Sequence, residues 1–146
     1  MPQNDSGLYI LVMDLKKMHV LTVGKLGRAM FLAGKYLYVG RAKRYLRSRL
    51  ARHLRREKKT FWHIDYLLQH ARLEDIWIKP GFVDECSTAA MIQSDGLKVS
   101  CPVPGFGSSD CRCLSHLFYF SGQERMLPRL CKNLGFEKVK KHGDSL

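Results

Sequence analysis

YVGRAKRYLRSRLARHLRREKK, residues 38–59, joins the end of a predicted strand to a strongly basic helix. Ten lysines and arginines, against one glutamate, occupy the nineteen positions 41–59. From residue 42 to about residue 56 the apolar pattern has a helical period. Leucine recurs at every fourth position, at Leu46, Leu50 and Leu54. We therefore expect a helix that buries a stripe of leucines and presents a basic flank.

That basic flank is a candidate phosphate-binding surface. On a helical wheel Arg49, Arg52 and Arg56 cluster beside the leucines, and His53 lies one turn beyond Arg49. A guanidinium group presents a rigid fork of donors that matches phosphate oxygens. This clustering predicts a cradle for a nucleic-acid backbone, and the alternative is a solvated basic face that serves only solubility. The charged residues assigned to this cradle are Arg41, Lys43, Arg44, Arg52, Arg56, Lys58 and Lys59.

The composition also indicates a polyanionic partner. The chain has 146 residues, of which 45% are hydrophobic, enough for one domain with a buried core. Its formal charge of +12 favours nucleic acid over a membrane surface or an acidic protein. No apolar run approaches the roughly 20 residues needed to span a bilayer, so we expect no membrane partner.

The ends of the chain and its cysteines bear on its location. The opening MPQNDSGLYI lacks both the basic and the long apolar region of a secretory signal. Five cysteines, an odd number, argue against a full disulfide framework. A cytoplasmic location is therefore the expectation.

Apolar runs before the basic helix predict strands. Residues 7–15 and 18–24 are β-rich runs joined by Lys16 and Lys17, which suggests a hairpin. Glycines punctuate further short strands between residues 27 and 40.

Helices and strands alternate after the basic helix. A second helix over 61–71 should bury Ile64, Leu67 and Leu68, with Trp62 and Tyr66 as packing residues. The remaining elements are a strand over 73–80, a helix over 84–94 with Asp84 as its N-cap, a structured loop over 101–111, a strand over 116–120, and a last helix opened by a Ser121 and Glu124 capping box and closed at Gly135.

This order of elements predicts a single α/β (α+β) domain with a small antiparallel or mixed sheet flanked by helices. We expect the domain to cover residues 7–135. A short segment, residues 1–6, would precede it, and a basic tail, residues 136–146, would follow it.

The motif CRCLSH holds three candidate soft metal ligands, Cys111, Cys113 and His116. The paired spacing of most structural zinc sites is absent. A fourth ligand would have to be Cys101, Cys86 or Asp110. Zinc binding by this loop is one hypothesis, and a role in shaping a site wall is the other.

The chain resembles the GIY-YIG nuclease superfamily. Gly7-Leu8-Tyr9, Tyr38-Val39-Gly40 and Arg49 in the following helix match its motifs. The chain is most similar to the Uri-type branch, over roughly residues 7–120. The matching segments are GLYILV, AGKYLYVG, RLARHLRREKK, WHIDYLL, the pair Glu85-Cys86, and PVPGFGSSDCRCLSHLFYF.

The resemblance implies a divalent-metal-dependent endonuclease that cleaves DNA with Mg²⁺ or Mn²⁺. By this likeness Tyr9 and Tyr38 are the motif tyrosines, and Tyr9 would position or deprotonate the attacking water. Arg49 would neutralise the scissile phosphate, with His53 as a second polar helper. Glu85 would hold the metal.

The likeness also assigns supporting roles. Gly40 would let the backbone approach the substrate closely. Asp84 is an alternative metal ligand to Glu85, and Ser109 and Asp110 would lie near the cleavage site. Because CRCLSH belongs to a block shared with the branch, we expect it to shape the wall of the active site.

Two rival functions remain open from the sequence. The first is a nucleic-acid-binding module that keeps the fold without cleaving. The second is a zinc-stabilised adaptor for acidic protein partners. Since phosphate contacts carry no base information, substrate preference and the choice between DNA and RNA are not predicted.

Overall fold

The computed structural model describes residues 5–55, 58–60, 62–81, 84–94, 99–108, 113, 115–120, 122 and 124–139. Its centre is a six-stranded sheet in the order β6-β7-β4-β1-β5-β8. The strands are β1 (Gly7–Leu15), β4 (Gly34–Ala42), β5 (Arg72–Pro80), β6 (Val99–Ser100), β7 (Leu117–Phe120) and β8 (Glu137–Val139). All five pairings within this sheet are antiparallel. The predicted α+β class with a small central sheet is confirmed.

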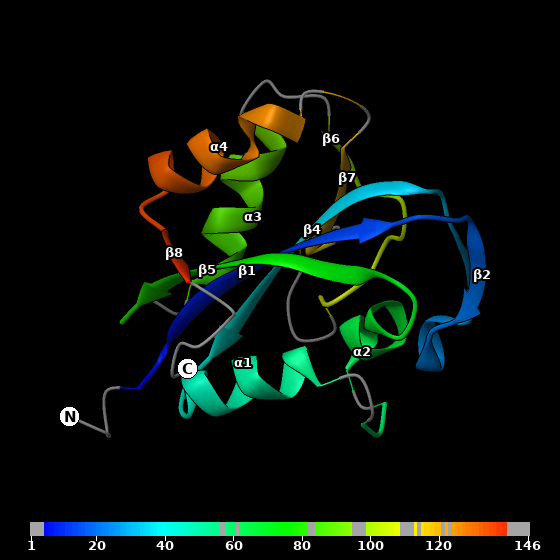
Figure 1. Ribbon diagram of the computed structural model, residues 1–146, viewed down its shortest axis with the longest axis horizontal. Helices are drawn as coiled ribbons and strands as arrows, with labels where there is room; N and C mark the ends of the chain where they lie inside the picture. Colours follow the sequence, from blue (N-terminus) through cyan, green and yellow to red (C-terminus); the bar gives the residue numbers. More distant parts are fainter. Residues whose placement is uncertain are drawn as a thin grey trace.

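Helices cover both faces of this sheet (Figure 1). On one face lie α1 (Leu46–Leu54) and α2 (His63–Leu68), and on the other α3 (Glu85–Ser94) and α4 (Leu127–Asn133). Successive side chains of β1 alternate between two cores: Tyr9 and Leu11 face one, and Leu8 and Ile10 face the other. The near-continuous apolar run in β1 therefore reflects a central strand that is buried on both sides.

The predicted hairpin between residues 7–15 and 18–24 is wrong. The strand β2 (His19–Thr22) instead pairs with β3 (Arg28–Phe31), with the 3-10 turn η2 (Gly24–Leu26) between them, in a separate two-stranded sheet. The nine residues of β1 pair with β4 and β5, which are equally long. A strand with two apolar faces must be covered along its whole length, and the half-exposed β2 is too short to do this.

The basic helix begins later than its apolar pattern suggests. The strand β4 continues to Ala42, which pairs with Gly7, so the helix starts only at Leu46. The residue before it, Tyr45, has a left-handed backbone (φ 57°). The leucine stripe is confirmed, because Leu46 and Leu50 are buried and Leu54 packs against the same core.

The second helix is shorter than predicted but buries the expected residues. It spans His63–Leu68 and turns Ile64, Leu67 and Leu68 inward. The predicted helix over 84–94 is α3, which begins one residue later at Glu85.

The sheet continues beyond residue 135, where we expected the domain to end. Residues 137–139 of the predicted tail form β8, which pairs with Ile76–Ile78 of β5. Phe136 is buried in the core beneath α3 and α4, so it anchors this last strand. The rest of the predicted tail, residues 140–146, lies outside the described residues, as does Ser121 of the predicted capping box.

Glu124–Met126 form the 3-10 turn η3, and α4 follows it. Pro128 stands in the first turn of α4, where a missing backbone N–H costs nothing. Among the described residues, no helix has the length and apolar character needed to cross a membrane.

Candidate active site

A cavity of about 120 Å³ opens where β1 and β4 meet the start of α3. Its lining residues come from six separate segments: Tyr9, Tyr38, Arg41, Arg49, Trp62, Glu85 and Gly107. Four of the five predicted catalytic residues therefore share one cavity, and the fifth, His53, lies behind Tyr9. Their catalytic roles stay a prediction, since proximity alone does not test them.

Gly40 makes room for the ring of Tyr9. The two residues are direct partners across the β1–β4 ladder, so both side chains would project from the same face. A Cβ atom at position 40 would lie 2.3 Å from Cζ of Tyr9. The phenol ring that crosses position 40 therefore requires glycine there. From the sequence we expected this glycine only to allow a close approach of the backbone to substrate.

The hydroxyl of Tyr9 lies 2.9 Å from Nε2 of His53, and both side chains are buried. Burial lowers the pKa of His53 to about 3, so its imidazole is neutral at pH 7. Burial also raises the pKa of Tyr9, although the nearby Arg49 opposes that rise. Both groups are therefore neutral at pH 7, and the tautomer of His53 determines which of them donates the hydrogen bond.

Tyr38 lies beside Tyr9, with ring centroids 6.5 Å apart. Burial holds the pKa of Tyr38 well above its usual value. Its ring packs against Gly107, where a Cβ atom would approach Cε1 to 2.8 Å. The backbone N–H of Gly107 donates to Nδ1 of His63 over 2.9 Å, which ties this loop to α2. Both motif tyrosines are thus neutral phenols in a preformed wall.

Arg49 is held in the cavity by two contacts. Its Nη1–H donates to the carbonyl oxygen of Arg41 over 2.6 Å, and its guanidinium lies 4.5 Å above the centre of the Trp62 ring. Arg52 stacks on the same ring at 4.4 Å. Trp62, which we expected only to pack, therefore orients two arginines. An aromatic residue just after the basic helix was the signal for this role in the sequence.

Glu85, the first residue of α3, supplies the only carboxylate among the described residues that line the cavity. Its Oε1 lies 3.0 Å from Nε of Arg41, and its Oε2 lies 3.5 Å from Nδ1 of His116. Its side chain is only 15% exposed. Asp84, the alternative metal ligand, instead accepts hydrogen bonds from the N–H and hydroxyl of Ser87, as an N-cap residue does.

Two residues assigned to phosphate binding serve the fold instead. Arg52 forms a two-pronged ion pair with the fully buried carboxylate of Asp65, at 2.8 and 2.9 Å. Lys58 donates from Nζ to the carbonyl oxygens of Arg52, His53 and Arg55, and so closes the C-terminus of α1. The sequence pattern placed both residues on a basic flank. It did not reveal that Asp65 is buried beside Arg52 or that α1 ends close to Lys58.

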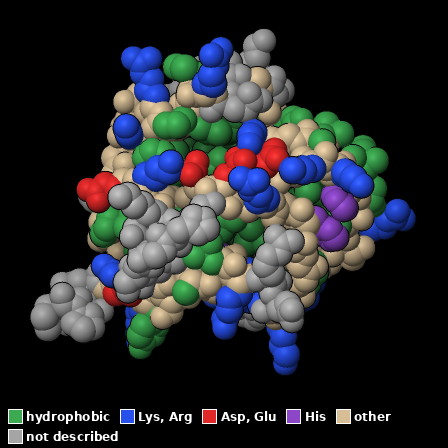
Figure 2. Space-filling view, viewed as in Figure 1, with side chains coloured by type: hydrophobic (Ala, Val, Ile, Leu, Met, Phe, Trp, Pro, Cys, Tyr) green, Lys and Arg blue, Asp and Glu red, His purple; other side chains and the backbone are tan. Residues whose placement is uncertain are grey.

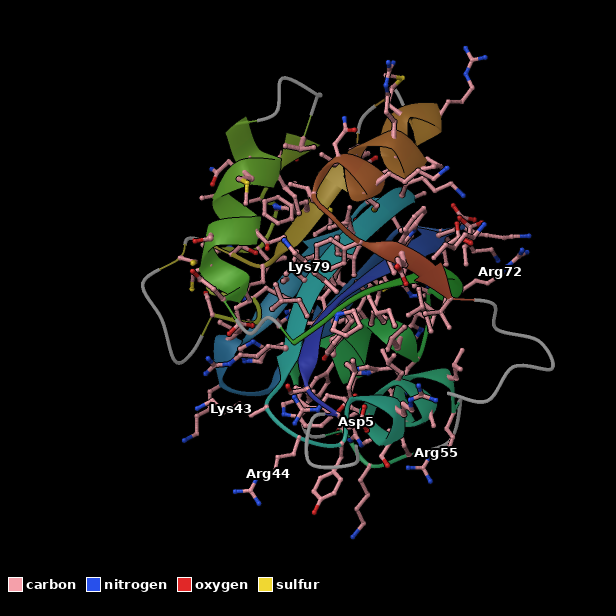
Figure 3. All side chains as sticks on the ribbon, turned by 90° about the vertical axis from the view of Figure 1, so that its left-hand side faces the viewer. Asp5, Lys43, Arg44, Arg55, Arg72 and Lys79 are labelled. Carbon is pink, nitrogen blue, oxygen red and sulfur yellow. The ribbon has the colours of Figure 1, made fainter. Side chains whose placement is uncertain are left out.

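The exposed basic residues border a second, wider recess of about 400 Å³. We call it the basic groove, and its lining residues are Arg41, Lys43, Arg44, Tyr45, Arg49 and Trp62. It shares three of these with the cavity, so the two recesses are adjacent. Figure 3 shows Lys43 and Arg44 extending outward from the end of β4, away from Arg72. Lys59 is exposed, and Arg56 lies outside the described residues.

Charge on a different side of the protein is arranged otherwise. Figure 2 shows a face on which lysines and arginines intermingle with acidic side chains. Lys35 pairs with Glu74 over 2.5 Å, and Lys138 pairs with Asp75 over 3.3 Å. The basic groove therefore concentrates positive charge, whereas basic and acidic side chains are mixed on the face in Figure 2.

The cysteine and histidine residues gather differently from the prediction. Cys86, Cys113 and His116 come together, with their ligand atoms all within 4.8 Å of one another. Cys111, Asp110 and Ser109 lie outside the described residues. Cys86, named only as a possible fourth ligand, is therefore a central member of the group, because α3 brings it beside the start of β7.

One family model, described as a domain of unknown function, DUF123, matches residues 8–138. The match covers all of the sheet except Gly7 and Val139, and it includes the lining residues of both recesses. Neither a curated protein nor a solved structure matches the chain significantly.

Proposed function

Because the chain belongs to the DUF123 family, a group related to the GIY-YIG nucleases, we propose that it is a divalent-metal-dependent endonuclease that cleaves DNA. Within the superfamily we place it in the Uri-type branch, on the likeness of its longest motifs. One observation carries the proposal. Tyr9, Arg49 and Glu85, separated by up to 76 positions in the chain, line one cavity that lies next to the basic groove.

The basic groove accounts for substrate binding in this proposal. Lys43 and Arg44 are exposed and would contact backbone phosphates on the way to the cavity. Tyr45 is 67% exposed, and its ring would offer a stacking surface to an unpaired base. Single-stranded or branched DNA is therefore the substrate class we favour over continuous duplex.

Tyr9 would orient the attacking water. In the tautomer whose Nε2 accepts from the phenol O–H, the oxygen of Tyr9 can accept a hydrogen bond from a water molecule in the cavity. Arg49 would stabilise the negative charge that develops on the phosphate, because its guanidinium is already fixed by Arg41 and Trp62. His53 then acts through Tyr9 as a positioning residue.

Glu85 is the residue that would hold the divalent cation. The fit is favourable because Mg²⁺ binds hard oxygen ligands, needs only one or two protein carboxylates, and keeps several waters, for which the cavity has room. The cation would supply charge neutralisation at the phosphate and lower the pKa of the attacking water. Arg41, which pairs with Oε1, would have to release that oxygen when the metal binds.

The test is cleavage of single-stranded, duplex and branched DNA, and of matched RNA, with Mg²⁺, Mn²⁺ or EDTA. We expect metal-dependent cleavage that falls at least about 100-fold in Arg49→Ala and in Glu85→Ala. Arg72→Ala is the control, because it removes an exposed arginine that Figure 3 places away from the groove. Cleavage that survives EDTA and both substitutions would reject the assigned mechanism. Binding without cleavage on every substrate would identify a non-catalytic binding module instead.

A further inference from the structure

The cluster of Cys86, Cys113 and His116 has no part in the proposed hydrolysis. Cys86 is the second residue of α3, and His116 immediately precedes β7, so the cluster joins a helix to the sheet. The imidazole is 1% exposed and both thiols are half-buried. The two segments are 30 residues apart in the chain, and their side chains converge on a single point.

The distances in this cluster match those around a tetrahedral zinc ion. Zinc bonds of about 2.3 Å to sulfur and about 2.0 Å to nitrogen put S and N roughly 3.6 Å apart and two sulfurs roughly 3.8 Å apart. Sγ of Cys86 lies 3.9 Å from Nε2 of His116, and all three ligand atoms lie within 4.8 Å of one another. Movements of a few tenths of an ångström to about 1 Å would bring these three ligands to tetrahedral spacing and leave the fourth position for water.

The backbone around His116 is already fixed. Its N–H donates to the carbonyl oxygen of Phe106 over 2.8 Å, and its own carbonyl accepts from the N–H of Val39 over 3.0 Å. The imidazole is thereby held with Nε2 toward Cys86 and Nδ1 toward Glu85. A ligand set built on such a frame needs little rearrangement to bind a metal.

We propose that Cys86, Cys113 and His116 bind a zinc ion, and that His116 thereby orients Glu85. Two thiolates and an imidazole favour zinc over Mg²⁺, which requires oxygen ligands. Nδ1 of His116 lies 3.5 Å from Oε2 of Glu85, and a shortening of about 0.5 Å would give the carboxylate–histidine–zinc arrangement that fixes ligand orientation in metalloproteins. Oε1 remains directed to Arg41 and the cavity.

The second half of this inference rests on the proposed function. If Glu85 holds the catalytic cation, the zinc ion fixes that carboxylate from behind without contacting the DNA. His116 is then a positioning residue and the zinc site is structural. The first half, zinc binding itself, stands on the cluster alone.

The first experiment measures the metal in the intact protein. We expect about one zinc ion per chain by mass spectrometry after purification without chelator. Protein stripped of metal and titrated with Co²⁺ should develop thiolate-to-cobalt charge-transfer absorption and the visible bands of a tetrahedral site. Absence of both zinc and the cobalt spectrum would overturn the proposal, and this readout does not depend on any variant folding.

The second experiment uses serine substitutions with an internal control. Cys86→Ser and Cys113→Ser should lower zinc content at least about tenfold, since losing a ligand costs more than an outer-shell change. Cys101→Ser is the matched control, because Cys101 is also a half-buried thiol but is not part of the cluster. Equal loss of zinc in all three variants would contradict the assignment.

A third measurement separates the zinc site from the proposed nuclease. Binding of Mn²⁺ to DNA-free protein, followed by electron paramagnetic resonance, reports on Glu85 without requiring cleavage. We expect Cys113→Ser to bind Mn²⁺ at Glu85 several-fold more weakly than the parent protein. The control Cys101→Ser, which retains zinc, should bind Mn²⁺ as the parent does. Zinc bound by a protein that never cleaves DNA would refute the nuclease but not the zinc site. Unchanged Mn²⁺ binding in zinc-free protein would refute the orienting role.

Discussion

Tyr9 and His53 form a buried hydrogen-bonded pair, with the phenol oxygen 2.9 Å from Nε2 of the imidazole. The pair joins the central strand β1 to the basic helix α1, so one contact connects the core to the wall of the cavity. The tautomer of this neutral imidazole determines the direction of the phenol proton. The chemistry available to Tyr9 therefore depends on a residue that does not line the cavity.

Replacing Tyr9 by phenylalanine should abolish most cleavage without preventing DNA binding. The substitution keeps the ring over Gly40 but removes the oxygen that would accept from water. We expect a loss of about 100-fold or more in the single-turnover rate, with the dissociation constant for DNA within about twofold. Tyr119→Phe is the control, because that hydroxyl bonds the carbonyl of Ala33 outside the cavity. Equal losses in both variants would show that Tyr9 serves stability only.

The buried neutral His53 should make the protein less stable in acid. Its pKa is about 3 when folded and about 6.5 when unfolded, so the unfolded state binds more protons between those values. Stability is therefore complete above pH 7 and declines as the pH falls below 6.5. From pH 7 to pH 4.5 this one group should cost roughly 2 to 3 kcal/mol.

Urea unfolding of the parent and of His53→Gln at several pH values measures this effect. Glutamine retains an acceptor for Tyr9 but does not titrate. Between pH 7 and pH 4.5 the variant should therefore lose roughly 2 to 3 kcal/mol less unfolding free energy than the parent. The other histidines are common to both proteins and cancel in the difference. Parallel stability curves for the two proteins would contradict a neutral buried imidazole.

Adjacent lysines should separate helix closure from DNA binding. Lys58→Ala removes the ammonium that contacts three carbonyl oxygens at the end of α1 and should lower unfolding free energy by about 1 to 2 kcal/mol. Lys59→Ala removes an exposed charge of the same type and should change stability by less than about 0.5 kcal/mol. Thermal unfolding of both variants tests the contrast, and equal melting temperatures would refute it.

The sequence pattern was sufficient for the class of fold, and the family resemblance identified four of the seven residues that line the cavity. Helical periodicity identified the stripe of Leu46 and Leu50, which the structure buries. The motif residues Tyr9, Tyr38, Arg49 and Glu85 meet because β1 and β4 are neighbours and α3 begins beside them. The family motifs predict these neighbours well because the motif residues come together in the fold.

Other features depended on contacts between distant segments. Arg52 is typical of a phosphate ligand until Asp65 is found buried beside it. The pairing of strands also depends on distant segments. Two apolar runs, residues 7–15 and 18–24, are joined by two lysines and therefore suggested a hairpin. In the structure β1 pairs instead with the longer strands β4 and β5. The role of Cys86 was hidden for the same reason, because its neighbours lie about 30 positions away.

The basic groove should produce a measurable salt dependence. The double substitution of Lys43 and Arg44 by alanine should remove two phosphate contacts. The logarithm of the DNA-binding constant falls linearly with the logarithm of the salt concentration, and this slope should become about 1.4 less steep on single-stranded DNA. The control removes two exposed arginines elsewhere, Arg72 and Arg129, and should leave the slope almost unchanged. Equal slopes for the two double variants would show that overall charge, not the groove, binds DNA.

Arg41 should compete with the divalent cation for Glu85. Its Nε lies 3.0 Å from Oε1, so a cation on that oxygen must displace it. Replacing Arg41 by glutamine removes the opposing charge and should lower the Mn²⁺ dissociation constant by about fivefold, or roughly 1 kcal/mol. Paramagnetic resonance titration of the DNA-free protein measures this constant directly.

Lys43→Gln is the matched control for Arg41→Gln, because it removes one positive charge from the same groove without a contact to Glu85. Both variants should bind DNA more weakly, since each loses a cationic group, but only Arg41→Gln should bind Mn²⁺ more tightly. If Arg41 instead holds Glu85 in the geometry that the metal needs, its loss will weaken Mn²⁺ binding. That result would make Arg41 part of the metal site's support and would remove the competition proposed here.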